Sequence, residues 1–236
     1  MFLFLKLYLA HLIADFVLQF EELYRLKLRA LRGHIYHVLI LAASSLVLAL
    51  PYLKDPFIWI FIGAISFIHL FQDMVKYSLQ QKDPKKMFWY FTIDQIFHLI
   101  FLSTILIFPI SKLVLDMPGL SQANFFYGSN RWTLGAILFI LSSFGGAYFL
   151  HAFRRSFFPN TREKHFITNF ELVHGVVERT WISFLWLCPH WIVIFLTPLI
   201  GFVRLFSNQL RSRPDFLLSF FYATLLGLVF RFFLGV

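Results

Sequence analysis

Long apolar runs recur along the whole chain, and a run of about 20 mostly apolar residues is enough for an α-helix to cross a bilayer. Of the 236 residues, 59% are hydrophobic and only 14% are charged. A soluble domain usually has about 25% charged residues. Such a chain cannot cover its own surface with polar groups, so lipid must be its solvent. We therefore predict an all-α fold, a polytopic transmembrane helix bundle that forms a single integral membrane domain over residues 1–236.

The apolar runs predict about eight spans, four within residues 1–110 and about four further ones within residues 131–236. Several prolines fall at their ends, as expected of a residue that cannot continue a helix. We interpret the first run as a retained span rather than a signal peptide, because no small-residue cleavage site follows it. Pro189 and Pro198 leave a hairpin or re-entrant pair as an alternative for the sixth and seventh spans. The expected spans are 1–19, 33–53, 56–79, 87–110, 132–153, 166–187, 191–206 and 216–234.

The loops alternate in positive charge, which predicts their orientation. Most lysines and arginines between spans follow the first, third, fifth and seventh runs, whereas the other loops carry only Lys54, Lys112 and Arg131. The positive-inside rule then places the basic loops in the cytoplasm and both termini on the outer side. The net charge of +9 fits anionic lipid headgroups, so the lipid bilayer is the expected partner and nucleic acid is not.

The first connection, residues 20–32, has the pattern of a short amphipathic helix. Its apolar residues share one face and most of its charged residues lie on others, which is typical of a helix lying in the membrane interface. The apolar set is Leu23, Leu26, Ala30 and Leu31, and the charged set is Glu21, Glu22, Arg25 and Arg29.

Ionisable residues inside the expected spans come in sets spaced three or four residues apart, so each set shares one helix face. Such residues are costly in a membrane and each needs a reason. At 1.5 Å per residue, most lie about 6 to 16 Å from the expected cytoplasmic ends, in one layer. The sets are His11 with Asp15, His34 with His37, His69 with Asp73 and Lys76, Asp94 with His98, and His174 with Glu178 and Arg179.

This layer has the composition of a metal site. Imidazole and carboxylate without thiolate suit a catalytic zinc, manganese or iron ion, with zinc favoured, and the single Cys188 excludes a cysteine-based zinc site. The expected metal ligands are His11, His37, His69, His98, Asp15, Asp73 and Asp94. The candidate catalytic acids or bases are Asp15, Asp73, Asp94 and Glu178, and the candidate substrate-binding residues are Lys76, Arg179 and Gln95.

Two other interpretations of the layer stay open. Its histidines and carboxylates can form a polar core that ties helices together without metal, in which Lys76 and Arg179 only neutralise carboxylates. Haem between paired histidines is also geometrically possible. The sequence has no H-E-x-x-H, G-x-S-x-G, Walker A or G-x-G-x-x-G motif, which gives no support to zincin, serine-hydrolase or nucleotide-binding chemistry.

Several motifs in the chain resemble one bacterial family. They are L-A-H-L-I-A-D-F-V-L-Q at 9–19, R-G-H-I-Y-H-V-L-I at 32–40, I-H-L-F-Q-D-M-V-K at 68–76, T-I-D-Q-I-F-H at 92–98 and H-G-V-V-E-R at 174–179. The family is named only as domain of unknown function 3307. The resemblance covers nearly the whole chain and is most specific in its first hundred residues. The resemblance implies a multi-pass protein of the bacterial inner (cytoplasmic) membrane. A looser similarity is to membrane-bound metal-dependent hydrolases.

Three functions follow as hypotheses. The favoured one is a membrane-embedded metal-dependent enzyme, a hydrolase acting on a lipid or lipid-linked substrate from the cytoplasmic leaflet. The second is a metal-ion or proton-coupled transporter that uses the same residues as a relay. The third is a non-catalytic subunit that binds a membrane-protein partner.

Overall fold

The computed structural model describes residues 2–114, 127–158, 169–188, 196 and 213–235. These residues form helices joined by turns and short connections, with no strand among them, so the predicted all-α fold is confirmed. Five helical stretches are long and apolar enough to cross a membrane: Leu31–Leu48, Pro56–Lys82, Pro84–Ile107, Asn130–Phe157 and Leu217–Leu234. The stretch Phe2–Val17 gives a sixth if it is taken together with Glu21–Arg29, to which it is bent by 86°.

The total of eight spans stays a prediction. The expected seventh span, apart from Leu196, lies outside the described residues, as do Pro189, Pro198 and residues 115–126. The other expected spans each coincide with a helix or a run of helices. The protein is therefore a membrane protein with about five evident spans in its described part.

The chain divides into two compact units. The first comprises Met1–Ile137 with Arg155–Pro159, and the second comprises Leu138–Arg154 with Asn160–Val236. The division falls within α7 (Asn130–Ile140) and again within α8 (Gly146–Phe157).

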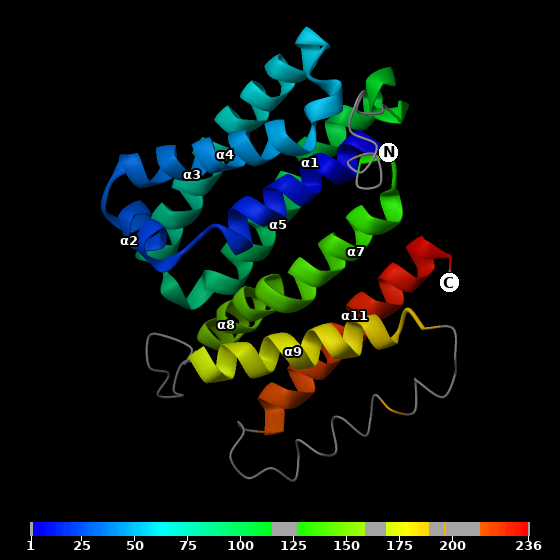
Figure 1. Cartoon of the computed structure of the whole chain (residues 1–236). Helices are drawn as coiled ribbons and strands as arrows, with labels where there is room; N and C mark the ends of the chain where they lie inside the picture. The colour runs from blue at the N-terminus through cyan, green and yellow to red at the C-terminus, as the bar shows by residue number, and fades with distance from the viewer. Residues whose placement is uncertain (1, 115–126, 159–168, 189–195, 197–212, 236) are drawn as a thin grey trace. The chain divides into compact units, whose positions relative to one another are not determined.

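Four long helices build the first unit: α1 (Phe2–Leu12), α3 (Leu31–Leu48), α4 (Pro56–Lys82) and α5 (Met87–Ser103). Both α1 and α4 pack against α3 and α5 (Figure 1). Short helices join them: α2 (Glu21–Arg29), η2 (Leu50–Tyr52), η3 (Pro84–Lys86), η4 (Thr104–Ile107) and η5 (Pro109–Lys112).

Helix α1 is the innermost helix of this unit. Its residues are mostly apolar, as expected of a helix surrounded by protein, and Leu3, Leu7 and Leu12 are at most 2% exposed. Leu3 and Leu7 belong to an apolar core with residues of α4 and α5. By contrast, α4 and α5 expose large apolar side chains such as Phe67 and Phe97, which suits contact with lipid.

Local sequence signals explain where the helices begin. Asp55 caps α4, because its carboxylate accepts a hydrogen bond from the backbone N–H of Phe57 at 2.9 Å, and Pro56 occupies the first helical position. Asp83 accepts in the same way from the N–H of Lys85 before α5. Such caps satisfy backbone donors that a helix start leaves without partners.

The end of α1 widens into a π-helix, η1 (Ile13–Val17). The N–H of Leu18 donates to the carbonyl of Ile13, five residues earlier, at 2.8 Å. π-helical turns are rare and often mark functional sites. Asp15 lies inside this turn.

Helix α2 folds back against α3, and Gly33 makes this possible. A Cβ atom at Gly33 would lie 2.4 Å from the backbone nitrogen of Lys27 and 2.5 Å from the carbonyl carbon of Leu26. Only glycine allows two backbones to approach this closely. This close approach brings Lys27, 3% exposed, into the interior of the unit.

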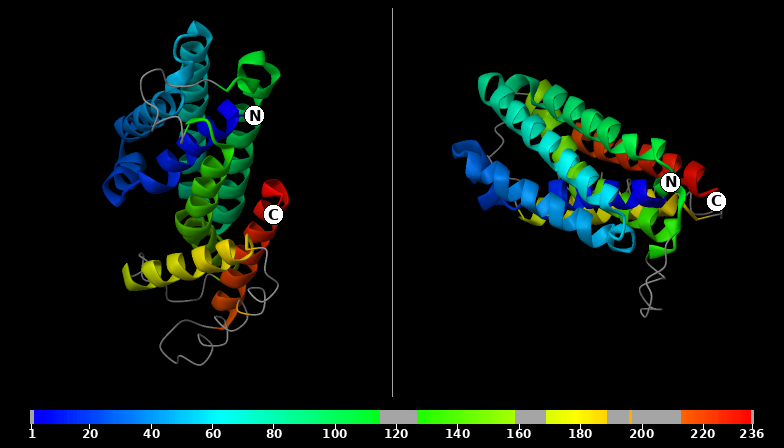
Figure 2. Two further views of the ribbon diagram at one scale, coloured as in Figure 1. Left: turned by 45° about the vertical axis from the view of Figure 1, so that its right-hand side comes forward. Right: turned by 90° about the horizontal axis from the view of Figure 1, so that it is seen from above.

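The second unit contains η6 (Leu141–Gly145), most of α8, α9 (Asn169–Leu185) and α11 (Arg213–Leu234). Helix α9 packs against both α11 and η6, and α9 and α11 cross in the left-hand view of Figure 2. η6 is a second π-helix.

Candidate metal centre

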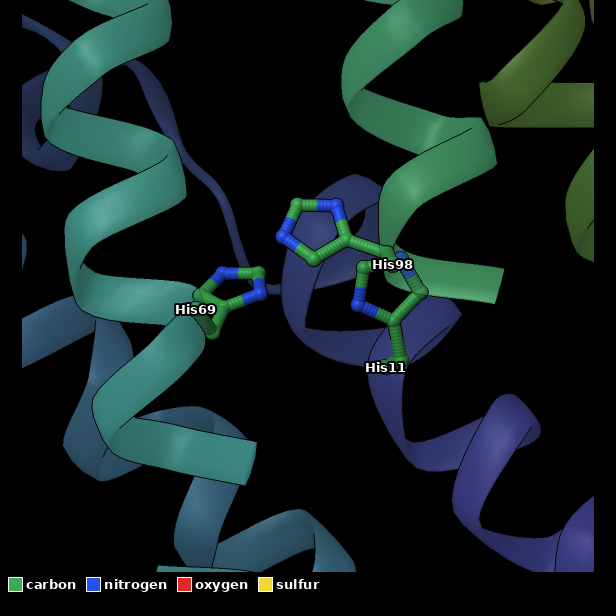
Figure 3. Close-up of side chains that lie close together, drawn as sticks. All are labelled: His11, His69 and His98. Atoms are coloured by element: carbon green, nitrogen blue, oxygen red, sulfur yellow. The ribbon is translucent and has the colours of Figure 1, made fainter. Parts of the chain in front are cut away.

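Six of the predicted metal ligands converge inside the first unit. They come from α1, η1, α3, α4 and α5, and none is more than 6% exposed: His11, Asp15, His37, His69, Asp94 and His98. Figure 3 shows the rings of His11, His69 and His98 turned toward one another from three helices. The ring centres of His69 and His98 are 4.2 Å apart, and those of His11 and His98 are 4.7 Å apart.

Three donor atoms form a particularly tight group. His37 Nε2 lies 2.9 Å from His69 Nε2 and 3.1 Å from Asp15 Oδ1, and His69 Nε2 lies 3.4 Å from the same oxygen. Ligands at about 2.0–2.1 Å from a tetrahedral zinc are about 3.3–3.4 Å apart. The three atoms therefore have nearly the mutual spacing of three ligands of one metal ion.

Hydrogen bonds alone satisfy this group poorly. A neutral imidazole carries one N–H, so the Nε2 hydrogen of His37 can point fully at Asp15 or at His69, but not at both. If both Nε2 atoms carry hydrogens, two donors face each other at 2.9 Å. A cation between His37, His69 and Asp15 would be bound by all three.

The charge of Asp15 leads to the same conclusion. Asp15 is 5% exposed, and no lysine or arginine among the described residues lies within 4.0 Å of its carboxylate. Its near neighbours are His11, His37 and His69, together with Gln95, whose Nε2 donates to Asp15 Oδ2 at 3.3 Å. A buried carboxylate without a cationic partner is strongly unfavourable, and a metal ion bound at Asp15 would compensate its charge.

The cluster also contains buried ring nitrogens that have no hydrogen-bond partner in the described part of the chain. They are His11 Nε2, His37 Nδ1, His69 Nδ1 and both ring nitrogens of His98. Asp94 Oδ1 is likewise buried without a hydrogen-bond partner among the described residues. Buried polar atoms are rarely left unpaired in folded proteins, and a concentration of them at one place indicates a site for a ligand.

Asp73 lies beside this cluster in an ion-pair network. Its Oδ2 is 2.9 Å from both Lys27 Nζ and His34 Nδ1, and its Oδ1 is 3.0 Å from Lys76 Nζ. The close groups of candidate metal ligands are His11–His69–His98, Asp15–His37–His69 and Asp15–Asp94–His98, and Asp73 is in none of them. The geometry thus places Asp73 with cations rather than with the predicted ligands.

Lys76 and Gln95 connect the network to the cluster. Lys76 Nζ lies 2.9 Å from Asp94 Oδ2, and Gln95 Nε2 donates to the same oxygen at 3.2 Å. Lys76 contacts the carboxylates of both Asp73 and Asp94, which agrees with the interpretation that it neutralises carboxylates. Substrate binding by Lys76 and Gln95 stays a prediction.

Glu178 and Arg179 belong to the second unit, where both are buried. Arg179 donates from Nε to the carbonyl of Ser142 at 2.8 Å and from Nη2 to the carbonyl of Ser143 at 2.9 Å, both in η6. Gly175 leaves room for the guanidinium, since a Cβ there would be 2.8 Å from Nη1. These contacts describe an arginine that supports the backbone of η6; its predicted role with Glu178 in catalysis or substrate binding stays a prediction, and the side chain of His174 is outside the described set.

Sequence reasoning assigned no individual role to two neighbours of the site, Lys27 and His34. Lys27 Nζ bonds to Gln19 Oε1 at 2.6 Å and to Asp73, yet the sequence shows it only as one basic residue of a loop. The spacing of His34 and His37 places both on one helix face. This spacing alone does not show whether His34 pairs with Asp73 or binds a metal ion. No sequence signal indicated the π-helix that carries Asp15.

Comparison with known proteins places the first half of the chain in a family. Residues 3–119 match the family described as "Protein of unknown function (DUF3307)", so the resemblance drawn from the motifs is confirmed there, and the match includes all six converging residues. The likeness expected in the second half lies beyond the matched residues. Neither the curated proteins nor the solved structures yielded a match.

Proposed function

We propose that this member of the DUF3307 family is a membrane-embedded metal-dependent enzyme, a hydrolase that acts on a lipid or lipid-linked substrate from the cytoplasmic leaflet. The observation that carries the proposal is the group of His37 Nε2, His69 Nε2 and Asp15 Oδ1, whose separations of 2.9 to 3.4 Å suit ligands of one ion. Zinc fits two imidazoles and one carboxylate, the set of protein ligands found in several catalytic sites.

Residues His37, His69 and Asp15 would hold the zinc ion, which when bound would lower the pKa of a water molecule to near neutral pH. The chain's own residues surround the place where that water would react. Asp94 Oδ2 is held by Lys76 and Gln95, so Oδ1 is the oxygen that either accepts a proton or binds a cation. Hydrolysis adds the water oxygen to the substrate's ester centre, breaks the bond to the leaving oxygen and returns a proton to that oxygen.

The surroundings of the site support the proposed substrate class. The cluster is enclosed by helices whose outer faces carry exposed apolar side chains such as Phe67, Phe71 and Phe97. A molecule carried by the bilayer can approach between such helices, whereas a water-soluble substrate would need a separate polar route.

The full topology is part of the same proposal. We infer eight spans in the bacterial inner membrane, basic loops in the cytoplasm, both termini outside and α2 in the cytoplasmic interface. The charge alternation of the loops supports this orientation. The α2 segment supports the interfacial position, since its exposed Glu21 and Arg25 lie opposite the buried Leu23.

A transporter would need a polar path across the unit. The first unit has a largely apolar core that includes Leu3, Leu7, Ile58, Phe61 and Ile62, with Leu102 and Ile105. This apolar core favours the enzyme over the transporter.

Metal analysis of the purified protein in detergent tests the proposal. Zinc should co-purify with, or bind stoichiometrically to, the wild-type chain, and His37→Ala or His69→Ala should lower the zinc content and weaken its retention against a chelator. His34→Ala is the matched control, because it removes a buried histidine on the same helix that pairs with Asp73 and should leave zinc binding intact.

Activity is then measured on vesicles of phosphatidylethanolamine and phosphatidylglycerol, with release of phosphate, headgroup or fatty acid as the readout. Zinc-loaded wild type should hydrolyse a component that the chelator-treated protein and His37→Ala leave intact. A folded wild-type protein that binds no metal would overturn the proposal. Metal-bound protein that instead moves protons or metal ions across liposomes would favour the transporter.

A further inference from the structure

The two oxygens of Asp15 face different groups of side chains. Oδ1 lies near His37 Nε2 and His69 Nε2, at 3.1 and 3.4 Å. Oδ2 lies 3.8 Å from His11 Nε2 and accepts a hydrogen bond from Gln95. The carboxylate therefore stands between two sets of potential ligands.

The second set is a candidate site in its own right. Asp15, Asp94 and His98 each offer a ligand atom within 4.8 Å of the others, and this group shares only Asp15 with the group of His37 and His69. His11 adjoins it, since its ring lies 4.7 Å from that of His98.

An ion bound by His37 and His69 would leave this second set unsatisfied. Both ring nitrogens of His98, Asp94 Oδ1 and His11 Nε2 are buried without hydrogen-bond partners in the described part of the chain. Lys76 and Gln95 engage only the other oxygen of Asp94. A further cation would bind one ring nitrogen of His98 together with Asp94 Oδ1, and His11 Nε2 is an additional donor beside them.

We propose that the cluster is a binuclear metal centre bridged by Asp15. One ion is held by His37 and His69, and the other by Asp94 and His98, with His11 beside it. This inference rests on the proposed function, and it narrows the substrate class. Two ions about 3.5–4 Å apart stabilise the attacking and leaving oxygens of an in-line displacement at phosphorus, so the substrate is a phosphate ester or diphosphate of a lipid.

Metal stoichiometry measures the second ion directly. The wild-type chain, loaded with zinc in detergent and freed of weakly bound metal, should hold two ions. His98→Ala and His37→Ala should each hold one, and Asp15→Asn should hold less than either. His34→Ala should keep two, and each variant should elute as a single symmetric peak, which shows that it is folded.

Electron paramagnetic resonance of the manganese-loaded protein gives a second readout that needs no activity. Two Mn²⁺ ions bridged by one carboxylate interact magnetically and give an exchange-coupled spectrum. Wild type and His34→Ala should show it, whereas His98→Ala should show the spectrum of an isolated ion.

The outcomes separate this inference from the proposed function. One ion per chain, lost in His37→Ala and kept in His98→Ala, would overturn the binuclear centre and leave a mononuclear enzyme. Two ions that neither substitution removes would be bound elsewhere and would also overturn it. A folded chain that holds no metal would remove both proposals.

Discussion

His37 and His69 point their Nε2 atoms at each other across two helices, 2.9 Å apart. Two neutral imidazoles can share one hydrogen at this distance, but Asp15 Oδ1 lies within 3.4 Å of both nitrogens. A cation accommodates three lone pairs directed at one point better than a single hydrogen does. This pair is therefore the feature from which the metal proposals start.

Metal removal should lower the stability of the protein. A ligand that binds only the folded state stabilises it by about 2.7 kcal/mol at 100 times its dissociation constant. Added zinc should raise the Tm of the metal-free wild-type protein, measured in detergent, and a chelator should reverse the change. Asp15→Asn should lose the response and His34→Ala should retain it; an equal response in both variants would contradict the assignment.

Asp73→Asn should destabilise the protein strongly. The substitution leaves Lys27, whose side chain is fully buried, without its carboxylate at 2.9 Å, and it removes one partner of Lys76. Breaking a buried pair from one side costs about 3–5 kcal/mol. The Tm should fall clearly. Asp83→Asn is the control, because Asp83 pairs with the exposed Lys86 at 3.2 Å. If Asp73→Asn lowered the Tm no more than Asp83→Asn does, the buried ion-pair network would add no stability.

Gly33→Ala should disturb the packing of α2 on α3. The added Cβ would meet the backbone of Lys27 at 2.4 Å, and a backbone segment cannot move aside as a side chain can. Overpacking of this kind costs about 1–3 kcal/mol. Thermal unfolding measures the loss, and Gly63→Ala, where a Cβ meets nothing within 4 Å, should show none of it.

Arg179→Lys should weaken the second unit although the charge is kept. The guanidinium donates hydrogen bonds from Nε and Nη2 to the carbonyls of Ser142 and Ser143. A single ammonium group cannot reproduce this geometry. One buried carbonyl left without a donor costs about 1–3 kcal/mol. The Tm of the variant reports this cost, and the exposed Arg155→Lys provides the comparison; unchanged stability in both would argue against a structural arginine.

The proposed orientation can be tested with the protein's single cysteine replaced. In a Cys188→Ser background, Lys85→Cys and Lys54→Cys place thiols at two exposed positions in successive loops. A membrane-impermeant maleimide should label Lys85→Cys only in inside-out vesicles and Lys54→Cys only in right-side-out vesicles. The reverse pattern would invert the topology, and labelling of both from one side would remove a span between them.

Much of the candidate site was predictable because helical spacing is a local property. His11 with Asp15, and Asp94 with His98, are four residues apart, so each pair must share a face of its helix. The cost of such residues in a membrane predicted that these faces turn inward, and all four are buried. The same spacing did not show that Asp73, which shares a helix with His69, lies among Lys27, His34 and Lys76; its role as a metal ligand stays a prediction.

The sequence by itself determined that the chain is an all-helical membrane protein with polar residues on the inward faces of its first helices. Composition and periodicity suffice for that, because the bilayer requires every backbone group to be bonded within its own helix. Only the tertiary structure showed that His37 Nε2 lies beside His69 Nε2 and that Asp15 lies in a π-helix between two groups of candidate ligands. It also showed that Gly33 allows α2 to approach α3 closely, which buries Lys27. These contacts depend on how far each helix is rotated and shifted against its neighbours. This rotation and shift are set by the packing of residues that are distant in the chain. The residue spacing within one helix carries no information about them.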